Sequence, residues 1–322
     1  MPAISAIGDP EARTAGSSGA RAREKTLATL FGFSAILMWS LLALLTARSG
    51  AVPPFQMNAL TFALGTLVGL AWLALRPKGG VPLRQTFRQP PAVWALGIVG
   101  LFGYHALYFA ALRHAPAAEA SLVAYLWPLL IVLGSALLPG ERLRWFHLIG
   151  GLLGLAGAAL IIAGRQNVDF SASHALGYGL AGLCALFWAG YSLLSRRFGH
   201  VPSEIVTGFC AATALLSALA HLLFETTVWP SGLGQWSSVV LLGLLPVGAA
   251  FYVWDHGVKH GDIQLLGAAS YAAPLLSTLV LVVAGEARTS VTLFLAAGLI
   301  TTGAALAALP LFARLIASRR AT

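Results

Sequence analysis

Charged residues are scarce in this chain, where they make up 10% of the 322 residues. A soluble domain carries about 25%, so there is too little charge here to cover the surface of a soluble fold. Hydrophobic residues account for 58% of the sequence. The composition therefore excludes an ordinary soluble domain and indicates a protein that lies in a membrane.

Cysteine is also nearly absent, and Cys184 and Cys210 both lie inside apolar runs. Two such thiols provide neither a disulfide framework nor the spacing of a metal site, and a buried cysteine usually acts as a small packing residue. Glycine pairs such as Gly177 and Gly179 do not extend into the glycine-rich pattern that binds nucleotides. We therefore expect no metal, no cofactor and no nucleotide site.

Long apolar runs dominate the sequence instead. Ten of them are about 20 residues long, the length at which a helix crosses a hydrocarbon core about 30 Å thick. The predicted spans are 27–47, 54–75, 93–112, 117–138, 145–163, 175–194, 204–224, 237–257, 264–284 and 291–312. The first run is longer than the apolar part of a signal peptide and no clear cleavage site follows it, so we expect it to remain as a span.

Lys and Arg are distributed unevenly between the predicted loops. If the N-terminus is cytoplasmic, the cytoplasmic segments hold 16 of the 20 Lys and Arg residues. The opposite face holds Arg48, Arg113, Arg165 and Arg288. This bias follows the positive-inside rule and predicts an even number of spans with both termini cytoplasmic. The net charge of +9 therefore reflects orientation in the membrane, and we expect membrane lipids, and no nucleic acid, as partners.

The second half of the chain repeats the first at an offset of 145 to 149 residues. The matching positions are Trp39 and Trp188, Arg48 and Arg197, Val52-Pro53 and Val201-Pro202, Arg113-His114 and Lys259-His260, Tyr125 and Tyr271, Pro128 and Pro274, and Gly140-Glu141 and Gly285-Glu286. Each repeat contains five spans. Because five is an odd number, the second repeat must insert upside down relative to the first.

The repeat also predicts how the chain divides. Residues 1–26 are rich in Ala, Gly, Ser and Arg and are expected to form a disordered cytoplasmic tail. The first five-helix repeat covers residues 27–164 and the second covers 165–316. Residues 317–322 form a short cytoplasmic tail.

The order of features in each half resembles the EamA-type repeat of the drug/metabolite transporter superfamily. These features are a span with Trp, a turn with a basic residue and His, a span with proline, a Gly-Glu pair and a glycine-rich span. Residues 103–109 (GYHALYF) and 125–128 (YLWP) look like its aromatic amino acid exporter branch (YddG-type). The resemblance implies an all-α integral membrane protein with ten transmembrane helices, arranged as two inverted five-helix repeats around a central cavity. It also implies export of aromatic amino acids across a bacterial inner membrane.

Candidate substrate-binding residues lie near the middle of the predicted spans. Tyr104, His105 and Tyr108 share a broad helix face. Because a polar group that faces lipid lacks a partner, we expect them to face a cavity or to pack against protein. Trp127 is too deep for an interfacial belt, and the matching position in the exporter branch belongs to the cavity. Its alternative is a Trp that faces lipid.

Further candidates come from the repeat. Trp39 and Trp188 are repeat mates, and Tyr191 lies on the same helix face as Trp188, so all three are expected in a pseudo-symmetric cavity or in repeated packing. The remaining candidates are Tyr252, Ser270 and Tyr271, together with Pro128 and Pro274 as hinge or kink positions beside the site.

Ionisable residues inside spans are functional candidates by default. Asp255 and His256 could gate or bind a proton, although their closeness to Lys259 favours a water-exposed helix end. Glu119 is expected to be solvated or to pair with Arg113.

Several functions compete with export of aromatic amino acids. A nucleotide-sugar carrier needs Lys or Arg in its cavity, and no Lys or Arg lies within the interior of a predicted span. A cationic-drug antiporter needs a deep carboxylate, and neither Glu119 nor Asp255 is expected to be deep. Other amino acids or drugs remain alternative substrates. A membrane-embedded enzyme is the least expected, because the histidines are scattered singly and no catalytic residue stands out. The sequence leaves open passive facilitation or proton antiport, and a monomer or an oligomer.

Overall fold

The computed structural model describes residues 10–76, 81–164 and 168–309, and within this part of the chain it is all-α. Among the described residues, nine helical segments are long and apolar enough to cross a membrane. The shorter apolar helix α16 corresponds to the tenth predicted span, whose last residues lie outside the described part. The predicted fold class is therefore confirmed.

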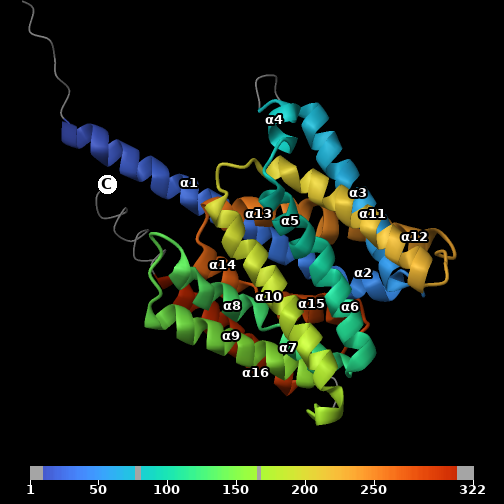
Figure 1. The fold of residues 1–322 in the computed structure, drawn as a ribbon. Helices are drawn as coiled ribbons and strands as arrows, with labels where there is room; N and C mark the ends of the chain where they lie inside the picture. The colour runs from blue at the N-terminus through green and yellow to red at the C-terminus, as the bar shows by residue number, and fades with distance from the viewer. Residues whose placement is uncertain (1–9, 77–80, 165–167, 310–322) are drawn as a thin grey trace, which may run out of the picture.

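The first repeat consists of five spans and one short loop helix (Figure 1). Its elements are α1 (Pro10–Trp39), α2 (Leu42–Arg48), α3 (Pro54–Leu75), the loop helix α4 (Leu83–Phe87), α5 (Pro91–Ile98), η1 (Val99–Gly103), α6 (Tyr104–His114), α7 (Ala117–Ala124), α8 (Trp127–Gly134), η2 (Ser135–Leu137) and α9 (Trp145–Ala163). Three of the spans are interrupted: α1 and α2 form the first, α5, η1 and α6 the third, and α7, α8 and η2 the fourth.

The second repeat also contains five spans, and two of them are interrupted. Its elements are η3 (Ala172–His174), α10 (Ala175–Arg197), η4 (Ser203–Ile205), α11 (Val206–Phe224), α12 (Leu233–Leu244), η5 (Leu245–Ala249), α13 (Ala250–His260), α14 (Ile263–Ala269), α15 (Ala272–Val283) and α16 (Val291–Ala307). Here α12, η5 and α13 form the eighth span, and α14 and α15 form the ninth.

The N-terminal segment differs from the prediction. Helix α1 begins at Pro10 and extends beyond the bundle (Figure 1), whereas a disordered tail was expected up to residue 26. The reason is that Ala and Arg are strong helix formers, and a helix that the first span has already nucleated extends at little cost. The tail of residues 317–322 lies outside the described residues.

Two π-helical turns reproduce the repeat in the backbone. The turn η1 interrupts the third span and η5 interrupts the eighth, and their bounds differ by the same 146 residues that relate the sequences. A π-turn inside an α-helix is rare and is common at functional sites. The two repeats therefore share a local distortion as well as a sequence pattern.

Both predicted proline positions lie next to helix breaks. Pro128 follows the break between α7 and α8, and Pro274 follows the break between α14 and α15. Proline lacks the N–H that would bond to the carbonyl four residues earlier, and its ring clashes with that carbonyl. The breaks also contact each other, because the Leu129 N–H donates to the Tyr271 hydroxyl at 3.1 Å.

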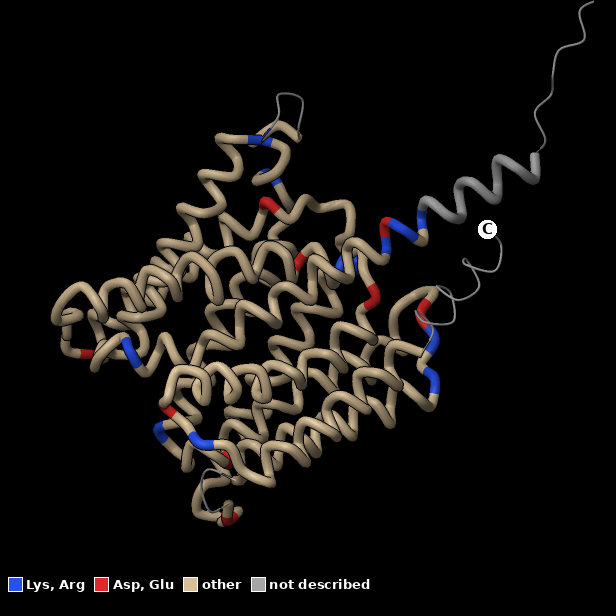
Figure 2. The backbone as a smooth tube through the Cα atoms, turned by 180° about the vertical axis from the view of Figure 1, so that it is seen from behind, with Lys and Arg blue, Asp and Glu red and all other residues tan. Residues whose placement is uncertain are grey.

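Ion pairs hold the two repeats together. Charged positions gather along two opposite sides of the bundle, with a wide uncharged band between them (Figure 2). The pairs that join one repeat to the other are Lys25–Asp262, Arg48–Glu286, Arg76–Glu204, Arg113–Glu225 and Arg196–Glu141. Each joins two residues that the charge bias assigns to the same side of the membrane.

The repeated Gly-Glu pair has the same role on both sides. Glu141 of the first repeat pairs with Arg196 at the end of α10, and Glu286 of the second repeat pairs with Arg48 at the end of α2. The preceding glycines, Gly140 and Gly285, have φ of 80° and 76°, a conformation that glycine adopts without a steric penalty. The motif thus turns the chain and fastens each repeat to the other.

On the predicted cytoplasmic side, Asp262 joins α1 to the start of α14. Its carboxylate accepts from the Leu265 N–H at the start of α14 and pairs with Lys25 of α1 at 3.1 Å. Its own N–H donates to the Thr29 hydroxyl. Burial by itself would raise the pKa of Asp262, but the Lys25 ammonium and the Leu265 N–H hold it below its usual value.

Candidate functional site

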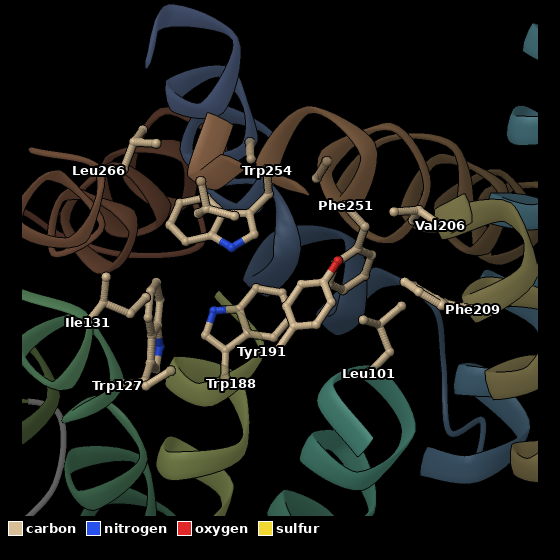
Figure 3. Packing of buried hydrophobic residues seen from close by; sticks show 14 of the residues in the cluster. Leu101, Trp127, Ile131, Trp188, Tyr191, Val206, Phe209, Phe251, Trp254 and Leu266 are labelled. Atoms are coloured by element: carbon tan, nitrogen blue, oxygen red, sulfur yellow. The ribbon is translucent and has the colours of Figure 1, made fainter. Parts of the chain in front are cut away.

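Six aromatic side chains from four spans meet in the interior of the bundle, and we refer to them as the aromatic cluster. Its members are Trp39, Trp127, Trp188, Tyr191, Phe251 and Trp254. Figure 3 shows five of these rings grouped between apolar residues of neighbouring helices. Both repeats contribute: the first supplies Trp39 and Trp127, and the second supplies the other four.

Trp188 of α10 lies at the centre of the cluster. Its ring centroid is 5.9 Å from that of Trp39, 6.2 Å from Trp127 and 6.2 Å from Trp254. Its ring also stacks on Tyr191 at 5.4 Å with an interplanar angle of 28°. Aromatic pairs at such distances each contribute about 0.5–1.5 kcal/mol beyond burial. The cluster is therefore a strong and specific contact between the repeats.

Hydrogen bonds orient the indole rings. The Trp39 Nε1–H donates to the carbonyl of Pro246 within η5, and the Trp254 Nε1–H donates to the Ser192 hydroxyl. A buried indole N–H needs such a partner. The π-turn therefore supplies the carbonyl that positions Trp39, which connects the backbone distortion to the site.

The third span extends the site. Tyr104 lies 5.6 Å from Trp188 between ring centroids, and Tyr108 stacks parallel to Tyr104 at 6.3 Å. His105 Nδ1 is 2.7 Å from the carbonyl of Leu101 within η1, and its ring contacts Phe251. Both π-turns thus hold a side chain of the site through a backbone carbonyl.

The structure brings together seven of the ten predicted substrate-binding residues. These are Trp39, Tyr104, His105, Tyr108, Trp127, Trp188 and Tyr191. Their binding of a substrate stays a prediction.

The other three predicted residues lie elsewhere. The Tyr252 hydroxyl donates to the Gly65 carbonyl, on the side of α3 and α11. The Ser270 hydroxyl donates to the Leu266 carbonyl of its own helix, and Tyr271 accepts from Leu129 at the break of the fourth span. Each of these hydroxyls has its partner outside the aromatic cluster.

Two members of the cluster were missed from the sequence, although the repeat contains the signal. An offset of 146 residues aligns His105 with Phe251 and Tyr108 with Trp254. Extending the alignment along the eighth span would have identified both. Phe62 of α3 was also missed; it stacks on Phe251 and contacts His105. The offset of 149 residues that relates Pro53 to Pro202 at the start of its span aligns it with Ala211.

A buried charged pair adjoins the cluster, contrary to the expectation of a water-exposed helix end. Asp255 is 1% exposed and Lys259 is 7% exposed. The Lys259 ammonium lies 2.7 Å from the Asp255 carboxylate and donates to the Val201 carbonyl. The lysine stem folds back along its own helix, which sequence spacing does not reveal. His256, by contrast, packs its ring against Phe31.

Glu119 also differs from its prediction. Its side chain is buried and accepts from the backbone N–H of Asp169, while Arg113 pairs with Glu225 instead. Glu225 in turn accepts from the N–H groups of Phe55 and Gln56 at the start of α3. An anion is favourable at a helix N-terminus, so the Glu225 carboxylate is held at the start of α3. Arg113 pairs with this carboxylate.

The predicted cavity wall is closed in this structure, because its side chains pack against one another. Trp127 is only 6% exposed, where a water-accessible wall residue was expected. A small cavity of about 10 Å³ lies beside the cluster, between the third, sixth, seventh and eighth spans. Among its lining residues are Ser195, Phe209, Asp255 and Lys259. It has room for about one water molecule.

Similarity to known proteins agrees with this architecture. The sequence pattern of the EamA-like transporter family matches residues 26–163 and 175–309. A protein from Ancylobacter novellus named aromatic amino acid exporter YddG is 57% identical over 286 residues, which cover 88% of this chain and 98% of that protein. A protein of the same name from Escherichia coli is 26% identical and covers 78% of this chain and 86% of its own length.

Two further comparisons are informative. The pseudopaline exporter CntI of Pseudomonas aeruginosa is 31% identical over 210 residues, which cover 63% of this chain and 68% of that protein. A crystal structure of a protein that is 57% identical has a TM-score of 0.83 to this chain, and the match covers 88% of this chain and 98% of the other. The fold is thus shared with a solved structure, and the family pattern matches this chain in two successive segments.

Proposed function

Because the chain belongs to the EamA-like transporter family, we propose that it exports aromatic amino acids or similar small amphipathic metabolites by alternating access. Inverted repeats commonly place a transporter's substrate near the membrane midplane, between the two halves. The relative that is 57% identical over 88% of this chain is named for aromatic amino acid export. In this proposal the protein is a carrier and not an enzyme.

The aromatic cluster is the observation that carries the proposal. Its rings come from both repeats and contact one another across the interface, as in the pair of Trp39 and Trp188. Any movement that separates the repeats breaks these ring contacts. An aromatic substrate replaces them with contacts of its own, whereas an aliphatic or strongly anionic substrate does not. The cluster therefore favours a substrate with an aromatic ring.

A counterflow screen of amino acids in proteoliposomes tests this function. Phenylalanine, tyrosine or tryptophan is expected to exchange at least about ten-fold faster than aspartate, glutamate or a sugar phosphate, because stacking is worth about 1–3 kcal/mol per ring. Liposomes without protein provide the baseline. A preference for organic anions would refute the substrate class and leave the fold intact.

We place both termini in the cytoplasm of a bacterium, with the ten spans in its inner membrane. The charge bias and the pairing of residues on each side support this orientation. Reporter fusions after residues 80 and 318 are expected to read cytoplasmic, and a fusion after residue 168 is expected to read periplasmic. A cytoplasmic signal at residue 168 would contradict both the number of spans and the inversion.

A further inference from the structure

The Asp255–Lys259 pair is costly for the protein to maintain. Both groups are nearly withdrawn from solvent within the eighth span. Removing two charges from water costs several kcal/mol per ion, and an apolar pair of similar volume is often at least as stable. Ionisable residues inside membrane spans accordingly mark functional sites by default. The pair therefore calls for a role other than stability.

Tyr191 connects this pair to the aromatic cluster. Its ring stacks on Trp188, and its hydroxyl donates to the Asp255 carboxylate at 2.9 Å. One tyrosine side chain therefore spans the distance from the cluster to the pair. Its ring lies in the cluster and its hydroxyl contacts the pair. An aromatic amino acid has a ring and a charged end at a similar separation. The small cavity beside the pair provides a starting point for opening this region.

We propose that Asp255 and Lys259 form a binding site for the zwitterionic head group of the substrate, with its ring in the aromatic cluster. Asp255 takes the substrate ammonium and Lys259 takes the substrate carboxylate. A zwitterion supplies one charge of each sign. When the substrate binds, its ammonium replaces Lys259 as the partner of Asp255, and its carboxylate replaces Asp255 as the partner of Lys259. No buried charge is therefore left uncompensated. This inference rests on the proposed function. It adds that the charged pair distinguishes an amino acid from other aromatic molecules.

The site occurs in one repeat only. The 146-residue offset aligns Asp255 with Phe109 and Lys259 with Arg113, so the first repeat lacks the carboxylate. Arg113 pairs instead with Glu225 at the opposite membrane face. The charge bias assigns the Lys259 end of the eighth span to the cytoplasm, where an exporter meets its substrate first.

Competition against labelled phenylalanine in counterflow tests the inference with two analogues. One is 3-phenylpropionate, which lacks the ammonium, and the other is 2-phenylethylamine, which lacks the carboxylate. Unlabelled phenylalanine is expected to compete about ten-fold better than either analogue in the wild type, as expected for charged hydrogen bonds. Asp255→Asn should reduce its advantage over 3-phenylpropionate to below about three-fold and keep its advantage over 2-phenylethylamine. Lys259→Met should reduce the advantage of phenylalanine over 2-phenylethylamine to below about three-fold and keep its advantage over 3-phenylpropionate.

The control variant is Glu204→Gln, which removes a carboxylate from the Arg76–Glu204 pair on the same predicted side. This variant is expected to keep the wild-type advantage of phenylalanine over both analogues. Where a variant transports too little to compete, ligand-induced shifts in melting temperature with the same three compounds give the ratios, because a ligand that binds the folded state stabilises it.

The possible failures can be told apart. If the wild type exchanges no aromatic amino acid, the proposed function fails and the inference fails with it. If the wild type exchanges phenylalanine and both variants keep the wild-type ratios, only the head-group site is overturned. Unchanged ratios with an altered pH dependence would identify the pair as a proton site, which also overturns the inference.

Discussion

Replacing Trp188 with alanine is expected to destabilise the protein and to weaken substrate exchange together. Trp188 is 3% exposed and contacts rings from the first, third, fourth and eighth spans. Truncating a buried Trp costs about 3–5 kcal/mol. Loss of a stacking surface worth about 1–3 kcal/mol lowers apparent affinity about five- to a hundred-fold. Melting temperature in detergent and counterflow at matched protein amounts measure the two effects.

Two further variants make the result specific. Trp188→Phe keeps an aromatic ring and should retain most of the stability and affinity. Trp72→Ala removes a Trp of α3 that is 61% exposed and does not belong to the aromatic cluster, so both properties should remain near the wild type. Normal exchange by Trp188→Ala at matched amounts would mean that the cluster is packing and does not bind substrate.

Replacing Gly150 with valine is expected to abolish stable folding. A Cβ at Gly150 of α9 would lie 2.6 Å from the carbonyl oxygen of Gly303 in α16, and a Cβ at Gly303 would lie 2.5 Å from the carbonyl oxygen of Gly150. Close approach of backbones through small residues is a main source of helix association in a membrane. The obstructing atoms belong to the backbone, so relief requires α9 and α16 to separate.

Overpacking usually costs about 1–3 kcal/mol and occasionally more, and separating two helices whose backbones are in contact is expected to exceed that range. Loss of the monodisperse peak in size-exclusion chromatography measures the effect. The matched control is Gly298→Val in α16, where an added Cβ would meet no atom within 4 Å. Equal behaviour of the two variants would disprove the role of the contact between α9 and α16.

The same contact answers a question that the sequence left open. Spaced glycines in the second span (Gly65 and Gly69) and in the fifth span (Gly150, Gly154 and Gly157) form close-packing faces, which can join either the two halves or a dimer. Gly150 and Gly157 pack against α16, and Gly65 packs against Gly248 of η5. Within the described residues, both faces therefore join the first repeat to the second.

The sequence determined the architecture because its signals are linear. The length of the apolar runs fixes how many segments can cross a bilayer, and the placement of Lys and Arg fixes which loops share a side. The repeat of Trp39 as Trp188 and of Pro128 as Pro274 locates the halves and their breaks. None of these signals requires knowledge of how the helices are rotated.

The tertiary structure alone decided which side each residue faces. Lipid and protein interior are equally apolar, so hydrophobic periodicity does not distinguish an inward face from an outward one in these spans. Tyr252 therefore points to α3 and α11, although its neighbour Phe251 lies in the aromatic cluster. The burial of Asp255 and Lys259 likewise depends on Tyr191 and Val201, which are far from them in sequence. Depth and rotation follow from these packing partners, and only the assembled bundle contains them.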